Sequence, residues 1–204
     1  MAIRQKSVSS ALAWALCIAM GSASAQTTIA GIKYEPEVTL GGQKLLLNGI
    51  GVRFRAVFKV YAAGLYTPVK ITQNEDVIKA STTSRMHLVA LRDVGGDEFG
   101  KLFVRGMEAN ATREEFARSI TSVVRMGQIF SDAKQFKQGD VILMDYVPGN
   151  GTVISHKGKQ LGDAFKEADF HSLLMKIWFG PKPVDEALRG ALLGQKTTAN
   201  NNVN

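Results

Sequence analysis

Cysteine is almost absent from this chain of 204 residues, and Cys17 is the only one. A disulfide within the chain and a cysteine-ligated zinc or iron–sulfur site are therefore excluded. Histidine is also scarce, and His87, His156 and His171 lie too far apart in sequence to form a pair with the spacing of a helical metal site. We expect these histidines to be structural or solvated, and we expect neither a metal nor a cofactor.

Several sequence motifs of catalysis and nucleotide binding are missing. The chain contains no G-x-S-x-G nucleophile turn, no phosphate-binding loop and no dinucleotide-binding fingerprint. Its adjacent carboxylates, Asp97/Glu98 and Glu114/Glu115, lie where helices are expected to start, and there they interact favourably with the helix dipole. The sequence thus points away from phosphate chemistry and from paired-carboxylate catalysis.

The chain is basic, with a formal net charge of +7 and a pI of about 9.6. Its lysines and arginines are scattered, however, and no block of them alternates with aromatic residues. Nucleic-acid binding requires a basic stripe or a known motif. We therefore expect a mildly basic, solvated surface and no nucleic-acid partner.

The first 25 residues contain the three parts of a secretory signal peptide. Arg4 and Lys6 form a basic start, residues 11–20 (ALAWALCIAM) an apolar stretch, and residues 23–25 (ASA) a cleavage site. The apolar stretch is too short to span a bilayer as a helix, so no stable membrane anchor should remain after cleavage. We expect a periplasmic protein that begins at Gln26, and its charge falls from +7 to +5 because Arg4 and Lys6 are removed.

The rest of the chain contains no internal repeat and no linker. Residues 26–194 are therefore expected to form a single domain, which is large enough for a hydrophobic core. The last residues, 195–204, are polar and rich in asparagine, and we expect them to be disordered. The oligomeric state does not follow from the sequence.

Apolar and alternating segments between turn residues predict strands in the first and last parts of this domain. Residues 37–40 and 43–47 form a hairpin around Gly41-Gly42. Residues 48–53 (NGIGVR) predict a glycine turn, after which residues 52–66 form a long strand that is buried on both faces. Further strands are expected at 85–92, 141–147 and 152–155.

Helical spacing of apolar residues predicts helices between and after these strands. Thr112 and Glu115 form a capping box that opens one of them. Its apolar face is expected to carry Phe116, Ile120, Val123 and Val124. Other helices are expected at 74–80, 97–108, 169–178 and 184–193. This order of elements predicts an α+β fold, with an antiparallel sheet and helices on one of its faces.

Arg53 is the main candidate for a binding residue, together with Tyr61 and Tyr66 on the strand that follows it. An arginine keeps its charge, so one beside a buried strand requires an anionic partner. That partner is either a structural Asp or Glu, with the tyrosines as part of the core, or the carboxylate of an amphipathic ligand. In the second case the guanidinium would bind the carboxylate, and a tyrosine hydroxyl would donate a further hydrogen bond.

The segment from Leu47 to Tyr66 resembles the start of the chalcone isomerase family in its residues LNGIGVR and FKVYAAGLY. The segments LRDV at 91–94 and KIWFG at 176–180 support this resemblance, which covers most of the domain. Within the family, the chain is most similar to secreted bacterial members. The family implies an open-faced β-sandwich, in which a large antiparallel sheet is covered by a layer of helices. That architecture agrees with the order of elements.

The resemblance also implies roles for single residues. In plant chalcone isomerases an arginine at this turn holds the developing oxyanion, and Arg53 matches it, while Tyr61 takes the place of a threonine. A helical tyrosine, a helical asparagine and a late threonine of those enzymes are replaced here by Phe116, Val123 and Ile177. Losing most of these donors should cost several kcal/mol of transition-state stabilisation, since one donor is typically worth about 3 kcal/mol. The family's fatty-acid-binding members resemble this chain in pairing the arginine with a tyrosine.

We therefore predict a non-catalytic periplasmic binding protein that holds a fatty acid or similar amphipathic carboxylate in an apolar cavity through Arg53, Tyr61 and Tyr66. Two alternatives stay open. One is a chalcone isomerase-type intramolecular lyase that acts on a phenolic enone, with Arg53 and Tyr61 as catalytic residues. The other is a structural or protein-interaction role without a ligand.

Overall fold

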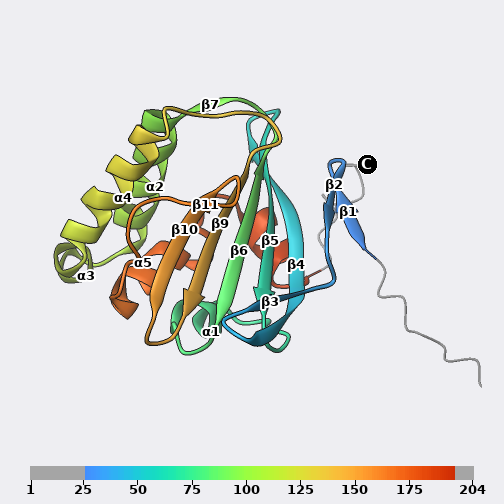
Figure 1. Ribbon diagram of the computed structural model, residues 1–204, viewed down its shortest axis with the longest axis horizontal. Coiled ribbons are helices and arrows are strands. Elements are labelled where there is room, and N and C mark those ends of the chain that lie inside the picture. Colours follow the sequence, from blue (N-terminus) through green and yellow to red (C-terminus); the bar gives the residue numbers. More distant parts are fainter. Residues whose placement is uncertain (1–25, 196–204) are drawn as a thin grey trace, which may run out of the picture.

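The computed structural model describes residues 26–195, and its main feature is a seven-stranded sheet with the order β11-β10-β9-β6-β5-β4-β3 (Figure 1). Every pair of neighbours in this sheet is antiparallel. In chain order its strands are β3 (Glu37–Leu40), β4 (Gln43–Arg55), β5 (Phe58–Thr67), β6 (Ser84–Ala90), β9 (Val141–Val147), β10 (Gly151–His156) and β11 (Lys159–Gln160).

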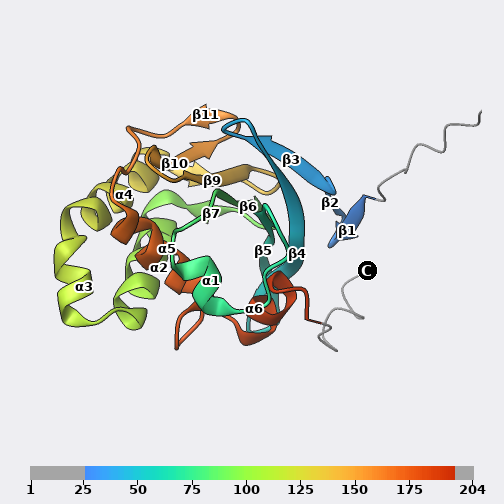
Figure 2. The ribbon, with the colours of Figure 1, turned by 90° about the horizontal axis from the view of Figure 1, so that it is seen from below.

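Two short strand pairs and a set of helices complete the described part of the chain. β1 (Thr27–Ile29) pairs with β2 (Ile32–Tyr34), and β7 (Val94–Gly95) pairs with β8 (Gln135–Phe136). The helices are α1 (Asn74–Ile78), α2 (Gly96–Asn110), α3 (Arg113–Arg118), α4 (Ile120–Asp132), α5 (Ala168–Phe179) and α6 (Glu186–Leu192). Figure 2 shows the sheet curling around α1, α5 and α6, with α2, α3 and α4 beside them.

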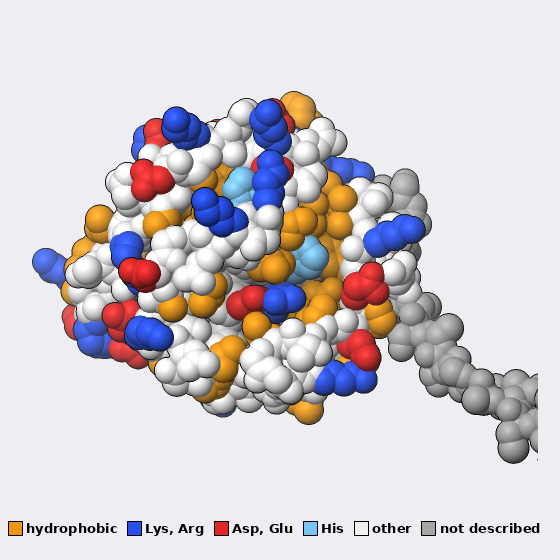
Figure 3. Space-filling model, viewed as in Figure 1, with side chains coloured by type: hydrophobic (Ala, Val, Ile, Leu, Met, Phe, Trp, Pro, Cys, Tyr) orange, Lys and Arg blue, Asp and Glu red, His pale blue; other side chains and the backbone are white. Residues whose placement is uncertain are grey.

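Strand alternation divides the apolar side chains between two cores. On β5, Tyr61, Ala63 and Leu65 face the helices, whereas Ala62 and Tyr66 face the opposite side of the sheet. The larger core fills the space between sheet and helices, and the smaller one packs with residues of β1 and β2 on the outer face. Figure 3 views this outer face, on which hydrophobic side chains surround several charged ones. The predicted fold class, an antiparallel sheet with helices on one face, is confirmed.

The predicted glycine turn at residues 48–53 is wrong. β4 runs through this segment as one strand, whose register with β5 shifts between Leu47 and Gly49 and again after Arg53. The chain reverses after Arg55, so residues 52–66 form two strands rather than one. The glycines serve close packing instead, because a Cβ atom at Gly49 would lie 2.1 Å from the carbonyl oxygen of Ala191 in α6. A Cβ atom at Gly51 would lie 2.8 Å from Leu188 Cδ1 of the same helix. Only glycine lets α6 approach β4 this closely.

The capping box at Thr112 is confirmed, but the helix it opens is short. The Glu115 amide donates to Thr112 Oγ1 over 3.2 Å, and the Thr112 amide donates to the Glu115 carboxylate over 2.9 Å. α3 ends at Arg118, and α4 begins at Ile120 after Ser119 leaves the helical conformation. This break changes the buried face, which on α4 is formed by Val123, Met126 and Phe130. The predicted apolar face is therefore wrong for Ile120 and Val124, which are 44% and 63% exposed.

None of the helices in residues 26–195 is both long enough and apolar enough to span a bilayer. The signal peptide predicted for residues 1–25 lies outside the described residues, and so do residues 196–204 of the predicted tail.

Candidate ligand-binding cavity

Arg53 and Tyr61 are brought together by the pairing of β4 with β5. They are direct cross-strand partners close to the turn of this hairpin. The Tyr61 hydroxyl accepts a hydrogen bond of 3.0 Å from the indole Nε1 of Trp178, which comes from α5. Because that oxygen accepts from Trp178, its own hydrogen is available for donation to another group.

Arg53 has an anionic partner within the protein, which is Asp185 at the start of α6. Nη1 of the guanidinium lies 3.4 Å from Asp185 Oδ2, and this is its single ion pair among the described residues. The Asp185 carboxylate also accepts hydrogen bonds from the amides of Phe54 and Leu188, at 3.2 and 3.1 Å. Asp185 thus caps α6 and accepts a hydrogen bond from β4. Its contact with Arg53 is long and involves one of the five N–H donors of the guanidinium, so the others stay available to a ligand.

Both Arg53 and Tyr61 line a cavity of about 190 Å³ between the β4–β5 hairpin and α2. Its wall is mostly apolar, and it is completed by Val60, Val94, Phe99, Leu102, Phe103, Gly106, Ile177 and Val184. Three further lining residues are charged: Arg55, Arg92 and Glu98. Arg55 Nη1 lies 3.4 Å from Glu98 Oε1, and this exposed ion pair connects the hairpin with α2. The cavity therefore combines an apolar wall with an excess of arginine.

The Tyr61 phenol keeps its proton over the ordinary pH range. Burial raises the pKa of Tyr61 to about 12, although the hydrogen bond from Trp178 and the charge of Arg53 oppose this shift. The phenol is thus neutral and able to donate, and the guanidinium is always cationic. Together they form a pair of donors that suits an oxyanion or a carboxylate.

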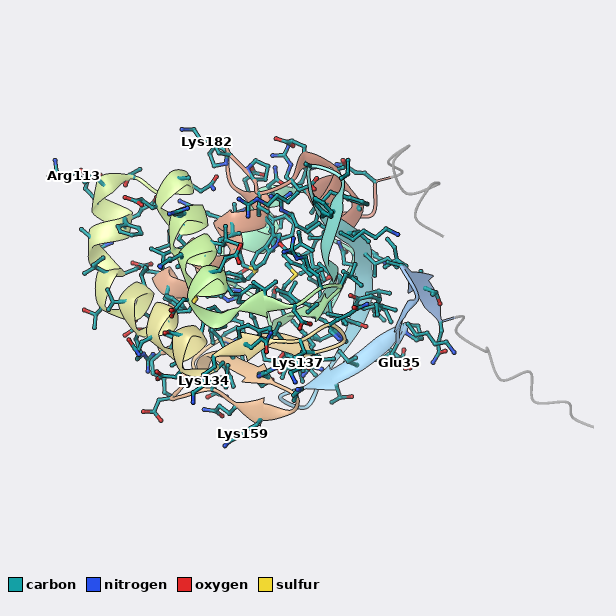
Figure 4. The ribbon with its side chains drawn as sticks, turned by 90° about the horizontal axis from the view of Figure 1, so that it is seen from above. Glu35, Arg113, Lys134, Lys137, Lys159 and Lys182 are labelled. Carbon is teal, nitrogen blue, oxygen red and sulfur yellow. The ribbon has the colours of Figure 1, made fainter. Side chains whose placement is uncertain are left out.

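Tyr66 lies on the opposite face of the sheet and does not line this cavity. Its ring packs in the outer core, and its hydroxyl donates to the carbonyl oxygen of Glu35 over 3.0 Å. Glu35, labelled in Figure 4, lies at the side of the molecule away from α3 and α4. Tyr61 and Tyr66 are five positions apart, and an odd separation in a regular strand places side chains on opposite faces. The structure thus brings together two of the three residues proposed from the sequence.

The positions implied by the family resemblance have different environments. Ile177 lines the cavity, with its side chain 3.2 Å from where a Cβ atom of Gly106 would be. Val123 is buried in the main core, and Phe116 packs at the edge of that core, so neither lines the cavity.

Sequence reasoning missed Trp178 and Asp185 as contacts of Tyr61 and Arg53 in the candidate site. Asp185 lies at the second position of the helix predicted at 184–193, and aspartate is a preferred N-cap, so its role at the start of α6 could have been inferred from the sequence. Its contact with Arg53 could not, because 132 residues separate the two in the chain. The hydrogen bond from Trp178 to Tyr61 spans 117 residues and was likewise hidden.

The histidines have structural environments. His171 is 1% exposed, with Thr152 Oγ1 at 3.1 Å from Nδ1 and Ser84 Oγ at 3.4 Å from Nε2, and burial lowers its pKa to about 3. His87 belongs to the outer face, where burial lowers its pKa to about 4. Both are thus neutral at pH 7. Within residues 26–195, no three His, Cys, Asp or Glu side chains are grouped as metal ligands.

Comparisons with known proteins agree with this architecture. A family model described as chalcone isomerase-like matches residues 26–194. No curated protein matches the sequence. Among solved structures, a fatty-acid binding protein from Arabidopsis thaliana superposes with a TM-score of 0.64 at 14% sequence identity, and the match covers 80% of this chain and 92% of that one. At this identity the likeness establishes a common fold.

Proposed function

This chain belongs to the chalcone isomerase-like family, and we propose that it is a non-catalytic binding protein for a fatty acid or similar amphipathic carboxylate. The observation that carries the proposal is the position of Arg53 and Tyr61. They are cross-strand neighbours, and both line an apolar cavity. A cation and a neutral phenol next to each other in the wall of an apolar space are complementary to a carboxylate with a hydrocarbon chain.

Binding would exchange partners at Arg53. The ligand's carboxylate would accept hydrogen bonds from the guanidinium and from the Tyr61 hydroxyl, and it would compete with Asp185, whose contact is a single one of 3.4 Å. The chain of the ligand would pack along Phe99, Phe103 and Ile177. Burial of this chain contributes roughly 25 cal/mol per Å² of apolar surface removed from water.

The size of the cavity limits the ligand. Its volume of about 190 Å³ is smaller than the roughly 300–1,000 Å³ of typical ligand pockets. The enclosed space therefore suits a short-chain acid, or the carboxylate end of a longer one whose chain passes out between Arg55 and Leu102. The neighbouring Arabidopsis protein, described as fatty-acid binding, supports the ligand class because the two proteins share a fold.

Catalysis as a chalcone isomerase-type lyase is the weaker hypothesis. Ring closure needs several donors placed around the developing enolate, and each is typically worth about 3 kcal/mol. Here Ile177 lines the cavity beside Arg53 and Tyr61, and the further donors of the lining are two exposed arginines, Arg55 and Arg92, of which Arg55 is paired with Glu98. A role in protein interaction alone gives no reason for a cation and a phenol to face an internal space.

We also propose that the protein acts in the periplasm. The support for this is the three-part leader in residues 1–25. N-terminal sequencing of the protein from a periplasmic extract should find Gln26 as the first residue. A cytoplasmic protein that begins at Met1 would contradict this location.

Calorimetric titration of the chain 26–204 with octanoate and palmitate tests the ligand class. Arg53→Ala should reduce octanoate affinity at least tenfold, since hydrogen bonds to charged groups contribute about 1.5–3 kcal/mol. Tyr61→Phe should reduce it less. Arg118 is a matched control because it is exposed and also lies 3.4 Å from an aspartate, and Arg118→Ala should change nothing. Tyr66→Phe is the control for Tyr61.

Equal affinities in the Arg53→Ala variant and the unmodified chain would reject this site. Turnover of a chalcone by the unmodified protein, lost in Arg53→Ala, would replace the binding hypothesis with the enzymatic one.

A further inference from the structure

The turn between β4 and β5 exposes two large apolar side chains next to each other. Val57 is 82% exposed and Phe58 is 62% exposed. Only Ala56 and Val57 lie between the two strands, so these side chains stand at the tip of a long hairpin. The hairpin reaches the upper edge of the molecule in Figure 1, and Figure 3 shows hydrophobic atoms beside Lys or Arg side chains at that edge.

The hairpin tip, defined as residues 55–59, adjoins the side of the ligand cavity on which the lining residues are exposed, and this side is called the cavity opening below. Arg55 at one end of the tip lines the cavity, and so does Val60 immediately after it. Leu102 on α2 lines the same cavity and is itself 39% exposed. The ion pair of Arg55 with Glu98 joins the tip to α2 across this opening.

The tip itself carries two positive charges and no negative one. Arg55 and Lys59 flank the two apolar residues, and Arg92, which lines the cavity, is exposed as well. Of the acidic residues next to these elements, Glu98 pairs with Arg55. Asp93 accepts from the Gln138 amide at 2.8 Å, and Asp97 accepts from the Ser131 hydroxyl, so both carboxylates keep their charge but bond to other parts of the chain than the tip.

We propose that the hairpin tip docks the cavity opening onto an anionic lipid surface. Exposed apolar side chains between two cations, Arg55 and Lys59, match the apolar interior and the anionic headgroups of such a surface. A protein partner fits less well, because a stable interface buries roughly 1,200 Å² or more, and this tip offers two apolar residues. The purpose of docking, exchange of an amphipathic acid between bilayer and cavity, rests on the proposed function.

Co-sedimentation of the chain 26–204 with lipid vesicles tests the proposal. We expect binding to vesicles of phosphatidylglycerol and phosphatidylcholine, weaker binding to pure phosphatidylcholine, and a decrease with salt. The double variant V57S/F58S should bind the anionic vesicles at least about tenfold more weakly, because the apolar contribution is lost. Val124 on α4 is a matched control at 63% exposure, and Val124→Ser should bind like the unmodified chain.

A second measurement locates the contact. The chain 26–204 contains no cysteine, so a polarity-sensitive dye can be attached at F58C or at V124C alone. Anionic vesicles should shift the emission of the dye to the blue in F58C and leave it unchanged in V124C. No vesicle binding by the unmodified chain, or equal binding by V57S/F58S, would overturn the docking proposal.

These outcomes are separable from those of the ligand proposal. V57S/F58S should retain its affinity for dissolved octanoate, whereas Arg53→Ala should lose that affinity and still bind vesicles. Loss of vesicle binding together with intact octanoate binding therefore tests docking alone.

Discussion

Replacing Asp185 by Asn separates the two functions of this carboxylate. Asp185 caps α6 through the amide of Leu188 and neutralises Arg53. Asparagine is as good an N-cap as aspartate, so the helix start should be preserved while the negative charge is removed. If a ligand carboxylate competes with Asp185 for Arg53, then Asp185→Asn should bind the ligand more tightly.

The expected magnitude follows from the geometry. Two unit charges 3.4 Å apart attract by about 1.2 kcal/mol in water and by about 5 kcal/mol at an effective dielectric constant of 20. The Arg53 and Asp185 side chains are 24% and 14% exposed, and the contact is long and single, so we take the lower end. A competing attraction of about 1 kcal/mol corresponds to an increase in affinity of about fivefold.

Calorimetric titration with octanoate at low salt measures this increase, and urea unfolding of the same samples controls for stability. Asp185→Ala removes both the cap and the charge, so it should show the same gain in affinity with an additional loss of about 0.5–2 kcal/mol in the free energy of unfolding. An unchanged or weaker affinity in folded Asp185→Asn would refute competition at Arg53.

Three further predictions concern stability. Gly49→Ala should lower the free energy of unfolding by about 1–3 kcal/mol in urea, because its Cβ atom would meet backbone oxygens of α6. Gly95→Ala is the control, since its Cβ atom would lie in open space and the free energy of unfolding should not change. Tyr61→Phe should cost about 1–3 kcal/mol, since the buried Trp178 donor loses its acceptor, and differential scanning calorimetry should show a lower Tm. Burial lowers the pKa of His171 to about 3, so below pH 6.5 the unfolded chain binds one more proton than the folded chain, and the free energy of unfolding should fall. In His171→Gln this fall between pH 6.5 and 4 should be smaller. Equal pH dependence of unfolding in the variant and the unmodified chain would contradict the lowered pKa.

Features set by neighbouring residues could be predicted from the sequence. The Gly41-Gly42 hairpin, the capping box at Thr112 and the last helix all follow from local turn and capping chemistry, and the structure contains each of them. Strand alternation also predicts the faces of single residues, because the five-residue spacing of Tyr61 and Tyr66 places them on opposite faces of a strand.

Features that depend on distant residues could not be predicted in the same way. Gly49 and Gly51 are typical of a turn when only their neighbours are considered. Their actual environment is α6, which lies about 140 residues further along the chain. Nothing in the local sequence distinguishes a glycine that bends the chain from one that admits a helix.

The same glycines explain how the binding site acquires its counter-ion. Gly49, Gly51 and Arg53 alternate along β4, so they face the same side of the sheet. The two glycines let α6 lie against the strand, and Arg53 then meets Asp185 at the start of that helix. A side chain at Gly51 should therefore displace α6 and move Asp185, so Gly51→Ala should change octanoate affinity as well as stability. Calorimetric titration that finds loss of stability with unaltered affinity would show that packing of α6 and the charge at Arg53 are independent.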